Sequence, residues 1–340
     1  MQKKLLTVAV AGVLSAPVVA MADVTVYGTI DTGIRTASKV CTAAGGAGCT
    51  ETGSLLSVTD GTRTTNRWGL KGSEDLGGGL RLNFTLEGTY TSDDNTDTLD
   101  GFNRKSLVGL SGGMWSVDVG RDYTVNFKAN GVMDPMSFTY TGITTTAGGT
   151  FTAGTRDNNL ITGDIKFGAS SVRIDYGLGE AVGSGASGDR LGVGVFLNFG
   201  PVSVAIASSS EETAVGVDTG TGNIGVAYKL GAFTIRGGIN GRSVDNGNDD
   251  AQWMAGLQYA ISPQWNGRVG YYDWKTENSA GAEIGRKKVF IAAVDYYLSK
   301  STTMYIEVDK YTLSGNQDGT AAGARMDGSM GIGAGVVHAF

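Results

Sequence analysis

The chain ends in the stretch SMGIGAGVVHAF, residues 329–340, where even-numbered positions are mostly apolar and odd-numbered positions are mostly small. Successive side chains of a β-strand point to opposite faces, so this alternation predicts a strand with one apolar face. The same period of two recurs at residues 80–90, 172–178, 191–199 and 233–242. The pattern indicates an all-β protein built from many similar strands.

Glycine supports this prediction, because the chain has 55 Gly but only 4 Pro and 2 Cys. Glycine inside a helix costs about 1 kcal/mol relative to alanine. Its spread through the whole chain, without a collagen-like period, therefore argues against helical structure. After residue 22 no window approaches 18 consecutive apolar residues, so spanning helices are not expected.

Two kinds of connection alternate between the predicted strands, seven of them short turns and eight of them long polar segments. A soluble sandwich does not require this alternation, whereas short turns on one rim and long loops on the other are typical of outer-membrane barrels. Seven short and eight long connections join 16 antiparallel strands. The short turns are expected at residues 74–79, 111–114, 167–170, 199–201, 230–232, 262–264 and 299–301, and the long connections at 37–61, 91–101, 123–155, 181–188, 213–218, 245–250, 277–284 and 314–325.

A sheet that crosses hydrocarbon must close on itself, because every backbone polar group needs a partner within the protein. We therefore expect a transmembrane antiparallel β-barrel of 16 strands, with the apolar parity facing lipid and the charged parity facing the lumen. Such a barrel is wide enough to leave an aqueous channel. The third long loop, residues 123–155, is too long to be idle by loop statistics. Both parities are apolar around residues 289–295, which we interpret as a strand facing a neighbouring subunit.

Residues 1–22 have the features of a secretory signal peptide. Two lysines precede an apolar stretch at residues 5–19, and an A-x-A cleavage site ends at Ala22. A transmembrane helix is the alternative, but about 15 apolar residues fall short of the roughly 20 that a span needs. We expect the leader to be removed and residues 23–340 to form a single barrel domain.

Charge and cysteine content restrict the possible partners. The net charge is −6, and it becomes −8 without the two lysines of the leader. No basic stripe or arm could release counterions from nucleic acid, so no nucleic-acid partner is expected. Cys41 and Cys49 predict one local disulfide that closes a surface loop in an oxidising compartment, with two free thiols as the alternative. No histidine or second cysteine pair lies nearby, so we expect neither a metal site nor a cofactor.

Several segments resemble the general porins of Gram-negative bacteria, and the β-proteobacterial branch most of all. They are DVTVYGTID at residues 23–31, NRWGLKGSEDLGGG at 66–79, GRDYTV at 120–125, RDNN at 156–159 and VHAF at 337–340. The resemblance covers essentially the whole mature chain. It implies a homotrimer of 16-stranded barrels in the outer membrane, surrounded by lipid and lipopolysaccharide, through which ions and small hydrophilic solutes diffuse. It also implies that loop 123–155 folds into the barrel lumen, and that Phe340 is read by the barrel-assembly machinery.

In this family a ladder of arginines on the barrel wall faces acids on the inserted loop. Arg67, Arg121 and Arg156 stand at matching positions, and Lys71 and Arg104 lie close by. The alternation independently places all of these in the lumen except Arg121, whose parity faces lipid. A lipid-facing arginine costs a few kcal/mol near the midplane, so we expect the strand to bulge at the preceding glycine.

The acidic side of the predicted constriction departs from the family pattern. Many members carry PEFGG on the inserted loop, whereas this chain reads MDPMSF at residues 133–138. Asp134 is then the one plausible loop carboxylate, and Asp122 is expected to pair with Arg121. The basic groups at the narrowest point favour anions, because charges further away are screened over about 8 Å at physiological salt. The wall acids that oppose this preference are Asp31, Glu87, Asp118, Asp164, Asp175, Glu307 and Asp309.

Other function classes have weaker support. An outer-membrane hydrolase needs an activated nucleophile with a base, and the only histidine, His338, lies on the lipid-facing parity near the end of the chain. We therefore do not expect an enzyme. A substrate-specific porin remains an alternative, since the aromatic residues Tyr123, Phe127, Phe138 and Tyr140 of the third loop could form a binding path. The second alternative is a barrel that serves as a scaffold for a surface adhesin.

Overall fold

The computed structural model describes residues 23–45, 48–92, 101–140, 149–180, 188–212, 217–318 and 324–340. The predicted leader lies outside the described residues. No described helix is long and apolar enough to cross a membrane. The strand segments are β1 (Asp23–Gly45), β2 (Gly48–Asp60), β3 (Arg67–Gly77), β4 (Leu80–Thr89), β5 (Lys105–Gly112), β6 (Trp115–Tyr123), β7 (Arg156–Phe167), β8 (Ser170–Gly177), β9 (Arg190–Phe199), β10 (Val202–Glu212), β11 (Asp218–Leu230), β12 (Phe233–Val244), β13 (Asp249–Ala260), β14 (Trp265–Glu277), β15 (Glu283–Tyr297), β16 (Thr302–Gly315) and β17 (Met330–Ala339).

The 17 segments form one closed antiparallel barrel of 16 strands, because β2 and β3 are two halves of one strand that lies along β1. Residues 61–66 interrupt that strand. The ring closes where β1 pairs with β17, with Thr29 opposite Ala339. Backbone hydrogen bonds of 3.0 and 3.1 Å between Gly28 and Phe340 complete the seam. The predicted barrel and strand number are confirmed.

All seven predicted short turns are present, but the first predicted long loop is not. At residues 37–61 the chain instead continues β1 and β2 outward as a paired hairpin. The segment is rich in Gly, Ala and Thr, so it lacks the apolar alternation that reveals the other strands.

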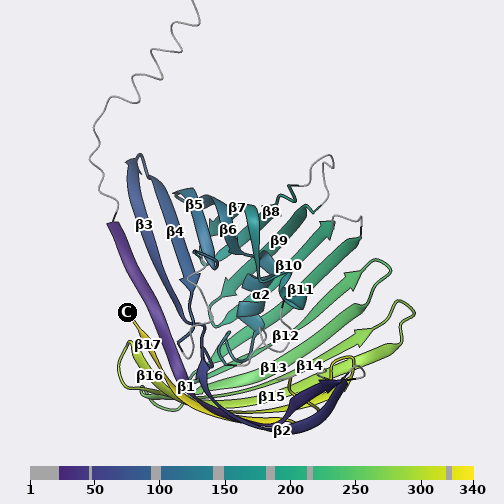
Figure 1. Ribbon diagram of the computed structural model, residues 1–340. Coiled ribbons are helices and arrows are strands. Elements are labelled where there is room, and N and C mark those ends of the chain that lie inside the picture. Colours follow the sequence, from purple (N-terminus) through teal and green to yellow (C-terminus); the bar gives the residue numbers. More distant parts are fainter. Residues whose placement is uncertain are drawn as a thin grey trace, which may run out of the picture.

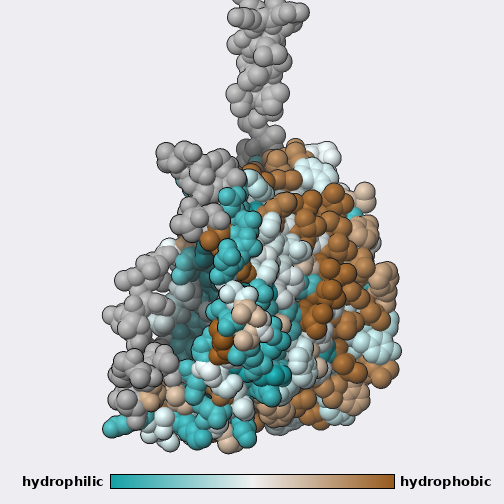
Figure 2. Space-filling model, turned by 90° about the vertical axis from the view of Figure 1, so that its right-hand side faces the viewer, coloured by the Kyte–Doolittle hydropathy of each residue, from teal (hydrophilic) through white to brown (hydrophobic). Residues whose placement is uncertain are grey.

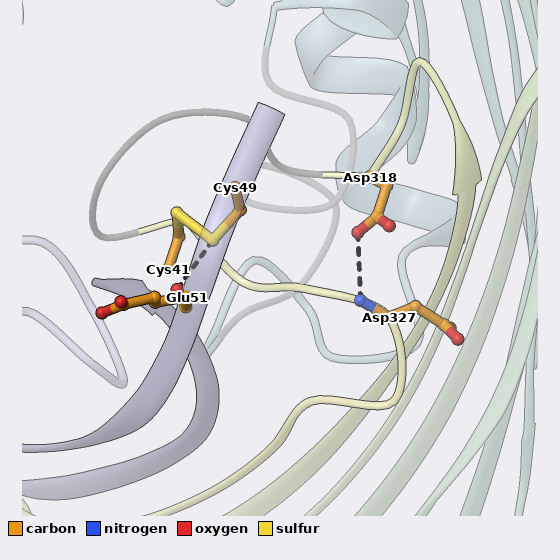
Figure 3. Close-up of a disulfide and its surroundings, with 5 residues drawn as sticks. All are labelled: Cys41, Cys49, Glu51, Asp318 and Asp327. Carbon is orange, nitrogen blue, oxygen red and sulfur yellow. Dashed lines mark hydrogen bonds between the residues drawn. A yellow bond between two sulfur atoms is a disulfide. The ribbon is translucent and has the colours of Figure 1, made fainter. Parts of the chain in front are cut away.

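The predicted disulfide is present and joins the two arms of this hairpin. The Cα atoms of Cys41 and Cys49 are 5.7 Å apart, a spacing typical of disulfides. Figure 3 shows the bond beside Glu51, with Asp318 and Asp327 of the β16–β17 connection nearby. The backbone N–H of Cys41 donates to the carbonyl of Ala324 at 2.9 Å, so the disulfide-linked hairpin is attached to that connection.

The two faces of the sheet differ as the alternation predicts. In β16 the side chains of Met304 and Ile306 are exposed, whereas those of Tyr305, Glu307 and Asp309 are buried. The exposed apolar side chains gather into a broad surface in Figure 2 (brown). This outer surface is the one expected to meet lipid, and the polar face encloses the lumen.

The connection between β6 and β7 contains α2 (Val125–Met133) and the 3₁₀ turn η1 (Thr150–Thr152). The hydroxyl of Thr124 caps the helix by accepting the N–H of Phe127 at 3.1 Å. The helix contacts the polar faces of β9 to β12, and Figure 1 shows it within the curve of the strands. Small residues on the wall make room for it. A Cβ at Gly225 would lie 2.2 Å from the Met133 side chain, so glycine is needed there.

The double apolar pattern of β15 is explained by this loop. Val289, Ile291 and Ala293 point inward and belong to the same buried cluster as Met136 and Tyr140 of the loop. Residues of the opposite parity, at positions 290 and 294, are exposed on the outer face. The second apolar face therefore packs against the chain's own loop, and a neighbouring subunit is not needed to explain it.

Candidate functional site

A cavity of about 860 Å³ lies between the loop that carries α2 and the barrel wall, which is formed here by residues from β3 to β7 and from β1, β16 and β17 at the seam. Aromatic and hydroxyl side chains of the loop and its hinges line one side: Tyr123, Phe127, Ser137, Phe138 and Thr139. Among the described residues that line the cavity no side chain is a carboxylate, and six are basic. The six are Arg63, Arg67, Arg104, Arg121, Arg156 and Lys300.

Arg121 reaches the cavity because the strand bulges before it. The pairing of β6 with β7 shifts register between Gly120 and Asp122, as the sequence predicts. Gly120 has φ of +134°, and a Cβ on it would lie 2.1 Å from the backbone oxygen of Ser106, so only glycine fits. The Arg121 guanidinium then donates to the carbonyl of Asn103 at 2.6 Å.

Tyr123, at the end of β6, holds two of the arginines together. Its hydroxyl accepts hydrogen bonds from Arg104 at 2.8 Å and from Arg156 at 2.7 Å. The Arg156 guanidinium carbon also lies 4.3 Å from the centroid of the Tyr123 ring, which is a cation–π geometry. One phenol thus contacts both guanidinium groups. Arg104 also pairs with the carboxylate of Glu87, whereas the phenol contacts Arg156 without neutralising its charge.

Counter-charges reach only some of the cavity arginines. Arg63 pairs with Asp295 at 2.7 Å, and Arg104 pairs with Glu87 at 2.7 Å. No salt bridge to a carboxylate of the described residues reaches the other three arginines, which are Arg67, Arg121 and Arg156.

The three other residues predicted for the constriction do not line the cavity. Lys71 is exposed on β3, with its ammonium 5.2 Å from the Tyr27 ring centroid. Asp122 does not pair with Arg121, because its carboxylate contacts Lys105 at 3.0 Å and Arg173 at 3.1 Å.

Asp134 lies on the far side of the loop, between the loop and the wall. It is fully buried, accepts the hydroxyl of Tyr272, and accepts the N–H of Phe138 at 2.5 Å. Burial raises the pKa of the Asp134 carboxyl, although these hydrogen bonds act in the opposite direction. The carboxylate that the sequence suggested would face the arginines instead fastens the loop.

The wall acids that oppose anion preference are mostly neutralised by wall arginines. Glu307 pairs with Arg35, and Asp309 pairs with Arg325 at 2.6 Å. Two further pairs lie near the N-terminus of α2. They are Asp164 with Arg173 at 2.9 Å and Asp175 with Arg190 at 3.4 Å.

Sequence reasoning missed two basic residues of the cavity. Arg63 lies in the interruption between β2 and β3, where the buried carboxylate of Asp31 accepts the N–H groups of residues 63 and 64, each at 2.7 Å. That interruption directly follows the predicted first loop, residues 37–61, and no alternation of apolar and polar residues marks it. Lys300 belongs to a short turn, and a lysine in such a turn is ordinarily expected to be solvated at the barrel rim.

The aromatic side chains of the loop form a stack. The ring centroids of Tyr123 and Phe127 are 4.3 Å apart with an interplanar angle of 7°. Those of Phe127 and Phe138 are 4.2 Å apart at 8°. Tyr140 is not part of this stack, since its hydroxyl donates to Asp295 on the wall.

Comparisons with known proteins agree with this architecture. A model of the Gram-negative porin family matches residues 6–335. Outer membrane porin protein 32 of Delftia acidovorans is 29% identical over 371 residues, covering 100% of both chains. Major outer membrane protein P.IB of Neisseria meningitidis serogroup A is 40% identical over 135 residues, which is 40% of this chain and 38% of that protein. The solved anion-selective porin from Comamonas acidovorans superposes with a TM-score of 0.79 at 24% identity, over 94% of this chain and 100% of that one.

Proposed function

This chain belongs to the Gram-negative porin family, and from that premise we propose that it is a general diffusion pore with a preference for anions. It is an integral β-barrel of the outer membrane, and ions and small hydrophilic solutes cross through its water-filled lumen. Its role is that of a channel rather than of an enzyme. The anion-selective porin from Comamonas acidovorans has the same fold, which is consistent with the proposed preference.

The observation that carries the preference is the charge of the cavity lining. Six basic side chains line the cavity, and no carboxylate of the described residues does. Two unit charges about 6 Å apart in water interact by about 0.7 kcal/mol before screening, so each guanidinium without a carboxylate partner changes the local concentration of a passing ion about two- to threefold. An anion is attracted at the narrowest point, and a cation is repelled from it.

We assign the constriction to Arg67, Arg104, Arg121 and Arg156 on the wall, facing the loop that carries α2. In this proposal Asp134 and Asp122 do not contact the passing ion. The first fastens the loop to the wall, and the second neutralises basic groups outside the cavity. Lys71 contributes its charge to the lumen from outside the cavity lining.

Further expectations complete the proposal. The chain is exported with residues 1–22 as its leader, and it assembles as a homotrimer in lipid and lipopolysaccharide. Phe340 serves as the signal for the barrel-assembly machinery. The residue is 57% exposed, and its ring lies over Gly28, at the seam where the barrel closes.

Planar-bilayer recording of the refolded protein tests the proposal. Conductance steps and the reversal potential across a KCl gradient are measured in the same membranes. We expect large ohmic steps in groups of three with a reversal potential of the anion-selective sign. A cation-selective sign would contradict the assignment of the arginines as controlling charges. The absence of steps from correctly folded barrels would contradict the open pore.

A further inference from the structure

We propose that the cavity is a transit site for planar aromatic carboxylates, in which the arginines hold the carboxylate and the stack of Tyr123, Phe127 and Phe138 holds the ring. This proposal rests on the proposed anion-preferring pore and adds a solute class to it. The selectivity for aromatic solutes comes from the aromatic stack, whereas the anion preference depends on the arginines alone.

Phe127, the middle ring of the stack, presents its edge to the cavity. Phe127 lies nearly parallel to a ring on each side, with centroid separations of 4.3 and 4.2 Å. Both faces of Phe127 are therefore covered, and the part that lines the cavity is its edge. Aromatic edges carry the positive end of the ring quadrupole and faces carry the negative end. An edge lining thus attracts both an anion and the face of another aromatic ring.

The cationic and aromatic sides of this site are joined through one residue. Tyr123 begins the stack, and its hydroxyl accepts hydrogen bonds from Arg104 and Arg156. Guanidinium groups are suited to planar, bidentate recognition of a carboxylate. A solute with a carboxylate attached directly to a flat ring can therefore meet a guanidinium and a ring edge together. Chloride and short aliphatic acids can contact only the guanidinium.

The stack lies on the cavity side of the packing core of the loop, and Phe138 also packs against that core. The apolar side chains that fasten the loop to the wall are fully buried, among them Val125, Met133 and Met136. Phe127 and Phe138 are only partly buried and lie on the cavity side. Placing Phe138 there requires positive φ values of 57° at both Ser137 and Phe138, a conformation that is costly for residues with a Cβ. This backbone conformation places the Phe138 ring between the packing core and the cavity, where it can contact a passing solute.

The size of the cavity also suits such a solute. Its volume of about 860 Å³ falls within the roughly 300–1,000 Å³ of typical small-molecule sites, so a single-ring acid fits with some of its water. The site is open along the pore, and binding there slows a solute without trapping it.

The experiment compares benzoate with cyclohexanecarboxylate, which has the same charge and ring size but no aromatic face. Each acid is added to the bilayer chamber in KCl, and the concentration that halves the chloride current is recorded. Edge-to-face aromatic contacts predict that benzoate is effective at a concentration about fivefold lower. In Phe127→Leu and in Phe138→Leu the two acids should become equally effective, because leucine keeps apolar bulk but has no ring edge.

Phe102→Leu is the matched control, since Phe102 contacts Trp68 and does not line the cavity. It should keep the benzoate advantage. Equal half-blocking concentrations in the unmodified protein would overturn the proposal, as would a benzoate advantage that survives both leucine variants. An anion-selective reversal potential with no benzoate advantage would overturn this inference alone, whereas a cation-selective potential would contradict the proposed function itself.

Discussion

Replacing Arg67 by glutamine removes one positive charge from the cavity wall with little change of volume. Arg67 is the best position for this test because its guanidinium makes the fewest interactions that the substitution would also remove. Its guanidinium makes a long hydrogen bond of 3.3 Å to the hydroxyl of Thr64, and no described carboxylate pairs with it. Arg67→Glu changes the charge by twice as much at the same position and supplies an internal scale.

The expected magnitude follows from the size of the cavity. A volume of about 860 Å³ corresponds to a sphere about 6 Å in radius, which sets the distance between a passing ion and the wall charge. At about 6 Å in water two unit charges interact by about 0.7 kcal/mol, and screening at 0.1 M salt reduces this to about 0.4 kcal/mol. Chloride and potassium respond oppositely, so Arg67→Gln should lower the anion-to-cation permeability ratio about fourfold, and Arg67→Glu about 15-fold. At 1 M salt the Debye length is about 3 Å, and the glutamine effect should shrink to about 1.4-fold.

The assay is the reversal potential across KCl gradients centred on about 0.1 M and then on about 1 M. Arg242→Gln serves as the control, because this arginine lies outside the cavity lining and pairs with Asp250 at 3.7 Å. An unchanged permeability ratio in Arg67→Glu at low salt would refute the reasoning. So would an equal effect at both salt concentrations, or an equal effect from the control.

Three further predictions concern the loop and the hairpin. Gly225→Ala places a Cβ 2.2 Å from the side chain of Met133, the last residue of α2, so the loop should shift and the single-channel conductance should change. Gly222→Ala is the control, because open space surrounds that position, and it should leave the conductance unaltered. Replacing both Cys41 and Cys49 by serine should destabilise the hairpin by about 2.5 kcal/mol, the chain-entropy value for so short a loop, and speed its amide hydrogen exchange while ion selectivity stays the same. Burial raises the pKa of Asp134 above its ordinary value near 4, so loop docking should weaken as pH rises from about 4 through the raised pKa. Asp134→Asn should remove that pH dependence of channel fluctuations, and an identical pH profile in the variant would contradict the argument.

The departures from the sequence-based predictions have physical causes that can be named. The alternation of side chains reveals a strand only where one face is apolar, so the Gly-, Ala- and Thr-rich arms that carry Cys41 and Cys49 show no strand pattern in the sequence. The bulge before Arg121 was predictable, because glycine permits it and a lipid-facing arginine is costly. The burial of Asp134 was not, because its partner Tyr272 lies 138 residues away along the chain.

The sequence by itself determined the outer architecture of this protein. The alternation within each strand and the spacing of the turns depend on residues that are close together in the sequence. Closure of the sheet follows from the hydrocarbon environment, in which a closed barrel is the only way to pair every strand. Only the tertiary structure decided which of the lumen charges are paired and which are left without a partner. Arg35 meets Asp309 across 274 positions of the chain, and Arg63 meets Asp295 across 232. Such pairs depend on strand register, on ring closure and on how the third loop packs against the wall. For that reason the alternation could place a side chain in the lumen but could not show whether its charge was left unpaired there.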